Sequence, residues 1–171
     1  MRIYKASLAV LAVILTVGSA RAQKIEKDYD HSKNFSDYKT FTWLRPPHLA
    51  DPLMDSRLQD AINKELTSKG WTQVSQGADI GIVANGATQQ QHSLTTFYDG
   101  FGGWRWRGLG TATTTVDTYT VGTLVVDLFD TKTKELVWRG TASDTLSDKP
   151  EKNTDKLNKA VEKLFKDFPP R

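Results

Sequence analysis

Apolar and polar residues alternate along several short segments of the chain, and this period of two predicts β-strands. Residues 38–44 place Phe41 and Trp43 on one face, and Pro46-Pro47 ends the segment because proline cannot donate to a sheet. Residues 80–85 are largely apolar, as is typical of a central strand. Further strands are predicted over residues 25–30, 71–74 and 111–120.

A hairpin is predicted where two alternating segments flank the turn at residues 130–134. The first segment, 123–129, follows Gly122, which we expect to break or bulge the preceding strand. The second segment of the hairpin is residues 135–142. Arg139 is expected to point away from the core and to pair with Asp127 across the hairpin. The residues expected on the inner face are Leu124, Val126, Leu128, Leu136, Trp138, Gly140 and Ala142.

Two amphipathic helices are predicted, over residues 55–68 and about 154–167, because their apolar residues recur every three or four positions. Asp51 or Asp55 could cap the first helix, and Gly70 suits the left-handed position after its end. Residues 86–110 between the strands are read as irregular. Hairpins and two helices together predict an α+β fold, with a mostly antiparallel sheet and both helices on one face.

The N-terminus has the features of a secretory signal peptide. Basic residues precede an apolar run at 6–17, which is shorter than the roughly 20 residues that span a bilayer. Ala20 and Ala22 form the small-x-small pattern of a cleavage site, so cleavage is expected before Gln23, leaving a single α+β domain at 23–171. An uncleaved anchor is the alternative. No transmembrane segment is expected in the mature chain.

Charge and composition narrow the function classes. The signal peptide carries three basic residues and no acidic one, so the 23 basic residues fall to 20 and balance the 20 acidic residues. We therefore expect no nucleic-acid partner, since a general affinity for phosphate needs a basic surface. The chain has no cysteine, which excludes disulfides, thiolate metal sites and N-terminal lipid attachment through cysteine. No cofactor is expected.

The candidate binding residues lie in a segment rich in glycine and aromatic residues at 97–110. Large rings on such a loop can stack on sugars or anchor a partner, whereas the alternative is that they fold back over the sheet. If residues 104–107 are extended, the two Trp side chains point to one side and the two Arg side chains to the other. The predicted site comprises Tyr98, Phe101, Trp104, Arg105, Trp106 and Arg107.

The sequence does not favour a metal site or a catalytic site. The oxygen-rich spacing at residues 28–34 is like that of a calcium loop, but Lys33 and Lys39 stand where glycine and glutamate are needed, so a turn is favoured. The three histidines, at 31, 48 and 92, have no metal-binding spacing. A hydrolase-like enzyme using residues 86–110, with His92, Ser93 and Asp99, is the alternative function, although no nucleophile motif supports it.

The chain resembles the bacterial exported family known as domain of unknown function 4136. The resemblance is carried by the motifs at residues 28–30, 34–43, 69–71, 78–80, 104–106, 119–127, 136–142 and 168–169, of which Trp138-Arg139-Gly140 after Gly122-Thr123-Leu124 is the most specific. Many members look like lipoproteins, but this chain lacks the required cysteine. Together with the missing cysteine, the resemblance implies a soluble exported protein, which we expect in the periplasm, with secretion or attachment to the outer membrane as alternatives. The family has no established activity, and because no motif supplies an activated nucleophile we expect no enzyme. We expect a binding or structural module whose partner is an envelope protein or glycan, or a docking subunit of an envelope complex.

Overall fold

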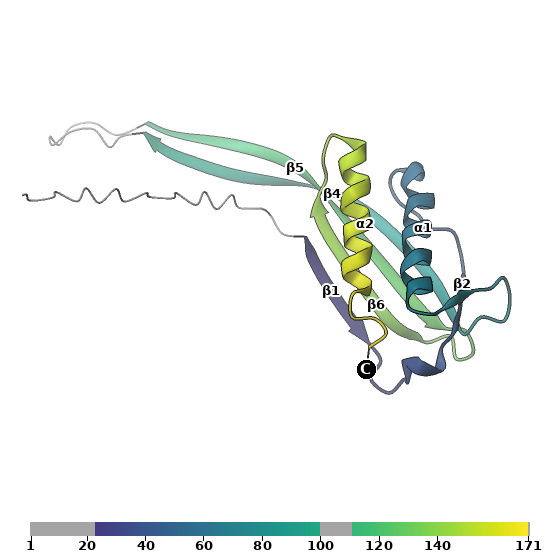
Figure 1. Cartoon of the computed structure of the whole chain (residues 1–171). Coiled ribbons are helices and arrows are strands. Elements are labelled where there is room, and N and C mark those ends of the chain that lie inside the picture. The colour runs from purple at the N-terminus through teal and green to yellow at the C-terminus, as the bar shows by residue number, and fades with distance from the viewer. Residues whose placement is uncertain (1–22, 100–110, 171) are drawn as a thin grey trace, which may run out of the picture.

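A computed structural model describes residues 23–99 and 111–170 of the chain. Six strands form one sheet in the order β1-β6-β5-β4-β2-β3, and two helices cover one face of it (Figure 1). Neighbouring strands are antiparallel, except that β2 runs parallel to both β3 and β4. The predicted α+β class is confirmed. The elements are β1 Lys24–Tyr29, the 3-10 helix η1 Phe35–Asp37, β2 Thr40–Trp43, α1 Pro52–Ser68, β3 Thr72–Gln73, β4 Ile80–Asp99, β5 Thr111–Asp130, β6 Leu136–Thr145 and α2 Pro150–Phe165.

Both helices begin earlier than the apolar period predicts, because each starts at a proline. Proline is favoured in the first turn, where its missing N–H has no helical partner to lose. Asp51 caps α1 by accepting from the backbone N–H of Leu53, and Gly70 follows the helix in the left-handed region with φ +87°. These two predictions at the ends of α1 are confirmed. The buried residues of α1 are Leu58, Ile62 and Leu66, and those of α2 are Ala160, Val161, Leu164 and Phe165.

The long strands β4 and β5 correct two predictions. Residues 86–99, read as irregular, continue β4, and Gly122 does not interrupt β5 but pairs in regular register with Thr88. The two strands pair along 20 positions without a register shift, from Ile80 opposite Asp130 to Asp99 opposite Thr111. The prediction for residues 86–99 failed because their sequence carries no apolar period.

The hairpin of β5 and β6 confirms most of the predicted inner face and corrects one residue. Trp138 and Ala142 are buried as expected, but Leu136 is 38% exposed and Val137 is buried instead. The register shifts between Leu128 and Phe129, where Val137 is the extra residue of a bulge. A bulge reverses the alternation on one side of itself, so Leu136 points outward.

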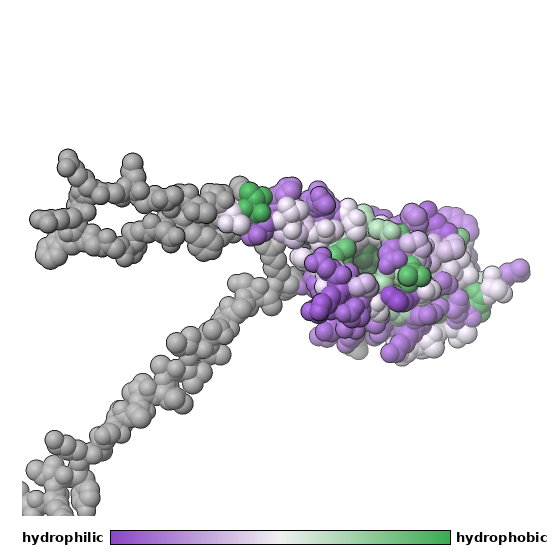
Figure 2. Space-filling model, turned by 90° about the horizontal axis from the view of Figure 1, so that it is seen from above, coloured by the Kyte–Doolittle hydropathy of each residue, from purple (hydrophilic) through white to green (hydrophobic). Residues whose placement is uncertain are grey.

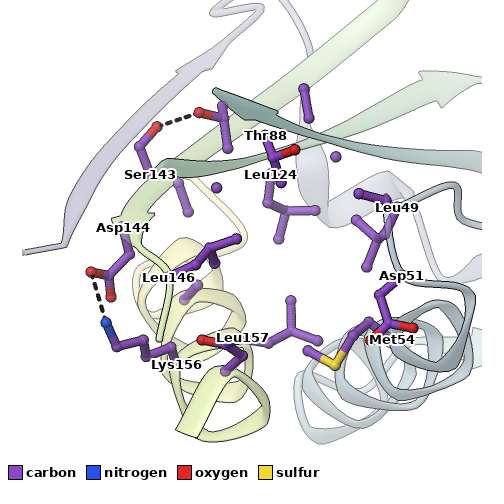
Figure 3. A pocket seen from close by; sticks show the side chains of 18 of the residues that line it. Leu49, Asp51, Met54, Thr88, Leu124, Ser143, Asp144, Leu146, Lys156 and Leu157 are labelled. Carbon is purple, nitrogen blue, oxygen red and sulfur yellow. Dashed lines mark hydrogen bonds and ion pairs between the residues drawn. The ribbon is translucent and has the colours of Figure 1, made fainter. Parts of the chain in front are cut away.

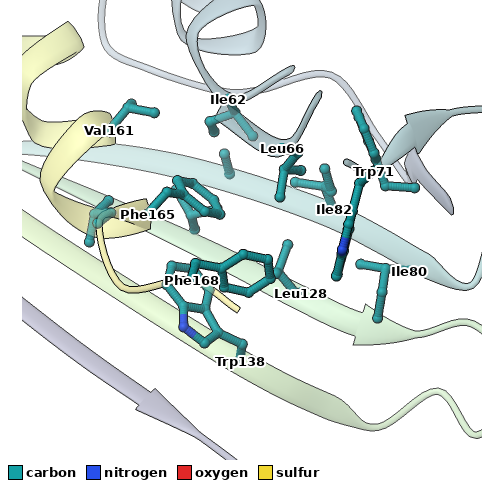
Figure 4. Packing of buried hydrophobic residues seen from close by; sticks show 14 of the residues in the cluster. Ile62, Leu66, Trp71, Ile80, Ile82, Leu128, Trp138, Val161, Phe165 and Phe168 are labelled. Carbon is teal, nitrogen blue, oxygen red and sulfur yellow. The ribbon is translucent and has the colours of Figure 1, made fainter. Parts of the chain in front are cut away.

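Six aromatic residues pack together at one end of the space between the sheet and the helices. Figure 4 shows four of them, namely Trp71, Trp138, Phe165 and Phe168. The ring of Trp138 stacks on Phe165 with centroids 5.1 Å apart, and Phe168 meets Trp71 edge-on at the same distance. Edge-to-face and offset contacts of this kind are the arrangements that aromatic quadrupoles favour. We call this group the aromatic cluster; its members are Phe35, Tyr38, Trp71, Trp138, Phe165 and Phe168.

Candidate functional site

The candidate site is a two-stranded ribbon that extends beyond the helices (Figure 1). Strand β2 pairs with β4 only at residues 80–82, and β6 pairs with β5 only at residues 121–129. Residues 90–99 and 111–120 therefore pair with each other alone in the described part of the chain, and we call them the ribbon. Ten residues at about 3.4 Å each give it a length of about 34 Å. At its base, the backbone N–H of Leu146 donates to the carbonyl of Thr120 at 2.7 Å.

The described side chains of the ribbon are polar except for Val116, which is exposed, and they are almost uncharged. Gln91 and Tyr119 face each other across the strands, and the Tyr119 hydroxyl donates to Gln91 Oε1 at 3.1 Å. The next pair repeats this arrangement, with His92 Nδ1 and Thr118 Oγ1 2.9 Å apart. In sequence, Asp99 and Asp117 are the ribbon's only acidic residues, and it has no lysine, arginine or proline. Sheet edges are commonly protected by charges, prolines or bulges, so this ribbon keeps its backbone accessible to another strand.

The predicted binding residues lie at the far end of this ribbon in sequence. Tyr98 belongs to β4 and is opposite Ala112 in register, but its side chain lies outside the described residues. The other five, Phe101, Trp104, Arg105, Trp106 and Arg107, also lie outside the described residues. The aromatic site therefore remains a prediction. Of the ribbon's two strands, the one at residues 111–120 was predicted as an exposed strand and is confirmed as part of β5, whereas the one at residues 90–99 was missed.

The residues of the hydrolase alternative are not brought together as a reactive trio. His92 and Ser93 are consecutive on β4, and successive side chains of a strand point to opposite faces. His92 instead contacts Thr118. The side chain of Asp99 lies outside the described residues.

The other residues considered for metal binding have structural surroundings. The turn favoured within residues 28–34 is confirmed, since the backbone N–H of Ser32 donates to Asp30 Oδ1 at 2.8 Å. The ring of His31 lies 4.2 Å from that of Tyr29, and His48 forms a backbone bridge with Asn85. Among the described residues, no group of three or more potential ligands could hold a metal ion.

Two buried carboxylates have structural partners. Arg139 Nε and Nη2 donate to the two oxygens of Asp127 at 2.6 and 2.8 Å, which confirms the predicted pair. Hydrogen bonding and attraction to Asp127 raise the pKa of Arg139. The hydroxyl of Tyr38 donates to Asp130 Oδ2 at 3.1 Å, and burial, followed by this bond, raises the pKa of Tyr38 to about 12. These contacts fix the hairpin and the aromatic cluster, and neither needs a ligand.

In the part of the chain that the structure describes, no helix is both long and apolar enough to cross a membrane.

Comparisons with known proteins identify the family and the fold. The family described as Domain of unknown function (DUF4136) matches residues 25–170. A search of curated proteins found no match. A DUF4136 family protein from Bacteroides thetaiotaomicron VPI-5482 is similar in structure, with a TM-score of 0.57 and 14% identity over 86% of this chain and 96% of that chain. At this identity the likeness is one of fold.

Two further solved structures share the fold. A PDZ domain protein from Parabacteroides distasonis ATCC 8503 has a TM-score of 0.57 and 14% identity over 87% of this chain, which spans only 36% of that protein. A PelC dodecamer from Paraburkholderia phytofirmans has a TM-score of 0.51 and 13% identity over 84% of this chain and 94% of that chain. The same layers therefore occur both as a part of a larger chain and in an assembly.

Proposed function

We propose, from the premise that the chain belongs to the DUF4136 family, that it is an exported cell-envelope protein acting as a binding or structural module. Export is supported by the signal peptide expected at residues 1–22. The ribbon and the aromatic segment between its strands together form the docking arm. Its partner is an envelope protein or glycan, and the module performs no catalysis of its own.

The observation that carries this proposal is the ribbon. Ten paired positions extend past the helices, and their outer edges have few charges to repel an added strand. An extended peptide can add to such an edge through backbone hydrogen bonds. The segment between the strands brings Trp104 and Trp106, whose indoles offer large contact areas at little cost in conformational entropy.

The test is recovery of envelope material on immobilised exported protein, after intact-mass analysis has checked that the chain starts at Gln23. Replacing both tryptophans (Trp104→Ala with Trp106→Ala) is expected to abolish recovery and to leave the melting midpoint unchanged. Adding charge to the ribbon (Gln90→Lys with Gln91→Lys) is expected to weaken recovery.

The matched control adds the same charges to two exposed glutamines far from the ribbon, as Gln73→Lys with Gln76→Lys, and should retain full recovery. A large loss of stability in the tryptophan variant with recovery unchanged would assign those rings to the core and overturn the docking arm. Because the fold also occurs in a PelC dodecamer, sedimentation of the same samples should report whether the partner is a second copy of this chain.

A further inference from the structure

A pocket of about 210 Å³ lies at the base of the ribbon, between the sheet and the first turns of both helices (Figure 3). Seen from above the helices, the surface here is hollowed and green within a largely purple surround (Figure 2). Strands β4, β5 and β6 supply its floor, and α1, α2 and the segments before them supply its walls. None of the described residues that line it belongs to the aromatic segment at 97–110, so its chemistry can be tested independently.

The wall of the pocket is aliphatic. Leu49 precedes α1 and Leu146 precedes α2, and both point inward with Leu124 and Leu157 (Figure 3). Met54 from the first turn of α1 adds a flexible thioether. Among the described residues that line the pocket, none carries an aromatic ring. A space lined in this way favours a flexible alkyl chain that can follow its shape.

Two glycines keep the floor of the pocket flat. A Cβ at Gly86 would collide with the Cδ2 atom of Leu49, and one at Gly122 would lie 2.8 Å from Cδ2 of Leu146. The two leucines therefore lie directly against the backbone of the sheet and form opposite walls. A side chain at either glycine would push its leucine into the space between them.

The polar groups around the mouth already have partners within the protein. Asp51 accepts from the backbone N–H of Leu53 at 3.0 Å, and Ser143 bonds Thr123 at 3.0 Å. Lys156 Nζ donates to the carbonyl of Thr145 and lies 3.4 Å from Asp144 Oδ1. An apolar ligand can therefore bind without breaking any of these hydrogen bonds.

The charges at the mouth select against an anionic ligand. Asp51 and Asp144 carry two negative charges against the single positive charge of Lys156. A carboxylate held beside them would meet a net negative rim, whereas a zwitterionic group can turn its cationic end toward the aspartates.

We propose that this pocket binds the end of an alkyl chain, namely the acyl tail of a lipid with a zwitterionic headgroup. Apolar cavities of about 150 Å³ remain dry and bind small hydrocarbons. A methylene is similar in size to water, whose share of the liquid is about 30 Å³, so 210 Å³ holds about seven carbons. The rest of the chain and the headgroup extend through the open mouth.

The test is calorimetric titration of the exported protein with n-alkylphosphocholines of four to ten carbons, each below its micelle concentration. Affinity should rise about fourfold per methylene, as expected for burial of each group, and should level off near seven carbons. Alkyl carboxylates of the same length should bind more weakly. A rise that continues through ten carbons, or tighter binding of the carboxylates, would overturn the proposal.

Substitutions that fill the pocket test whether the alkyl chain binds there. Leu157→Phe fills it and should weaken the eight-carbon ligand at least tenfold, and Met54→Phe should do the same from the opposite wall. The control is Leu53→Phe, because Leu53 is on α1 but 71% exposed and outside the pocket. The assignment would be wrong if a filled variant that melts like the wild type bound the eight-carbon ligand as tightly as the control variant does. It would also be wrong if benzene bound the wild type as tightly as the eight-carbon ligand.

Discussion

The two ends of the space between helices and sheet share β6 and α2 but are filled differently. At one end the aromatic cluster packs large rings against one another, and its buried members are at most 9% exposed. At the other end leucines, alanines and Met54 line a pocket of about 210 Å³. Large planar rings fill the first end, whereas small and flexible side chains leave space at the second. The comparison indicates that the aromatic end stabilises the fold and that the aliphatic end has space for a ligand.

The largest expected effect is at the aromatic end. Trp138 is 2% exposed and contacts Phe165 and Phe168, so Trp138→Ala should lower the free energy of unfolding by about 3–5 kcal/mol. Denaturant titration would measure this change. Arg139→Ala, next to it but facing outward, should cost less, about 1–3 kcal/mol, because it leaves the buried Asp127 without its hydrogen-bond donor. If the arginine variant were the less stable of the two, the face assignment of β6 would be wrong.

A smaller effect is expected at the pocket. Leu146 is only partly buried and borders empty space, so Leu146→Ala should cost about 1–2 kcal/mol, less than the 2–5 kcal/mol typical of a buried leucine. Leu66→Ala, at a fully buried position of α1, is the matched comparison and should show the full cost. Equal losses measured in the same denaturant titrations would mean that the pocket end is packed as tightly as the core, contrary to the comparison.

The sequence predicted the aromatic end better than the pocket end. The alternation around Trp138 and the period that places Leu164 and Phe165 on one helix face are local patterns, and both are confirmed. The outward turn of Leu136 depends on a bulge against β5, which no pattern within β6 reveals.

The pocket and the ribbon depend on pairings between distant segments. Gly122 was taken for a break, because only the folded chain shows that Leu146 lies against it. Likewise, the polar residues 86–99 have no apolar period, and their strand is evident only from pairing with residues 111–124. Of the candidate site, the sequence could therefore predict the aromatic composition of the segment at 97–110 but not the ribbon that carries it.

The smallest effect concerns a polar contact at the aromatic end, where Tyr38 donates to Asp130. Burial and this bond raise the pKa of Tyr38 to about 12 in the folded protein, above its ordinary value of 10.0. The folded state therefore favours the neutral phenol. The resulting stabilisation is fully present below about pH 10 and is lost as the pH rises through about 12.

Tyr38→Phe keeps the ring and removes the hydroxyl, so it should cost about 1 kcal/mol at pH 7, the typical net value of one hydrogen bond. In wild type, the free energy of unfolding should fall more steeply between pH 10 and pH 12 than in the variant. Urea titrations across this range, with Tyr119→Phe on the ribbon as the matched control, would measure the difference. Parallel pH curves for wild type and Tyr38→Phe would show that the hydroxyl titrates alike in both states, so that the aromatic end is held by ring packing without this bond.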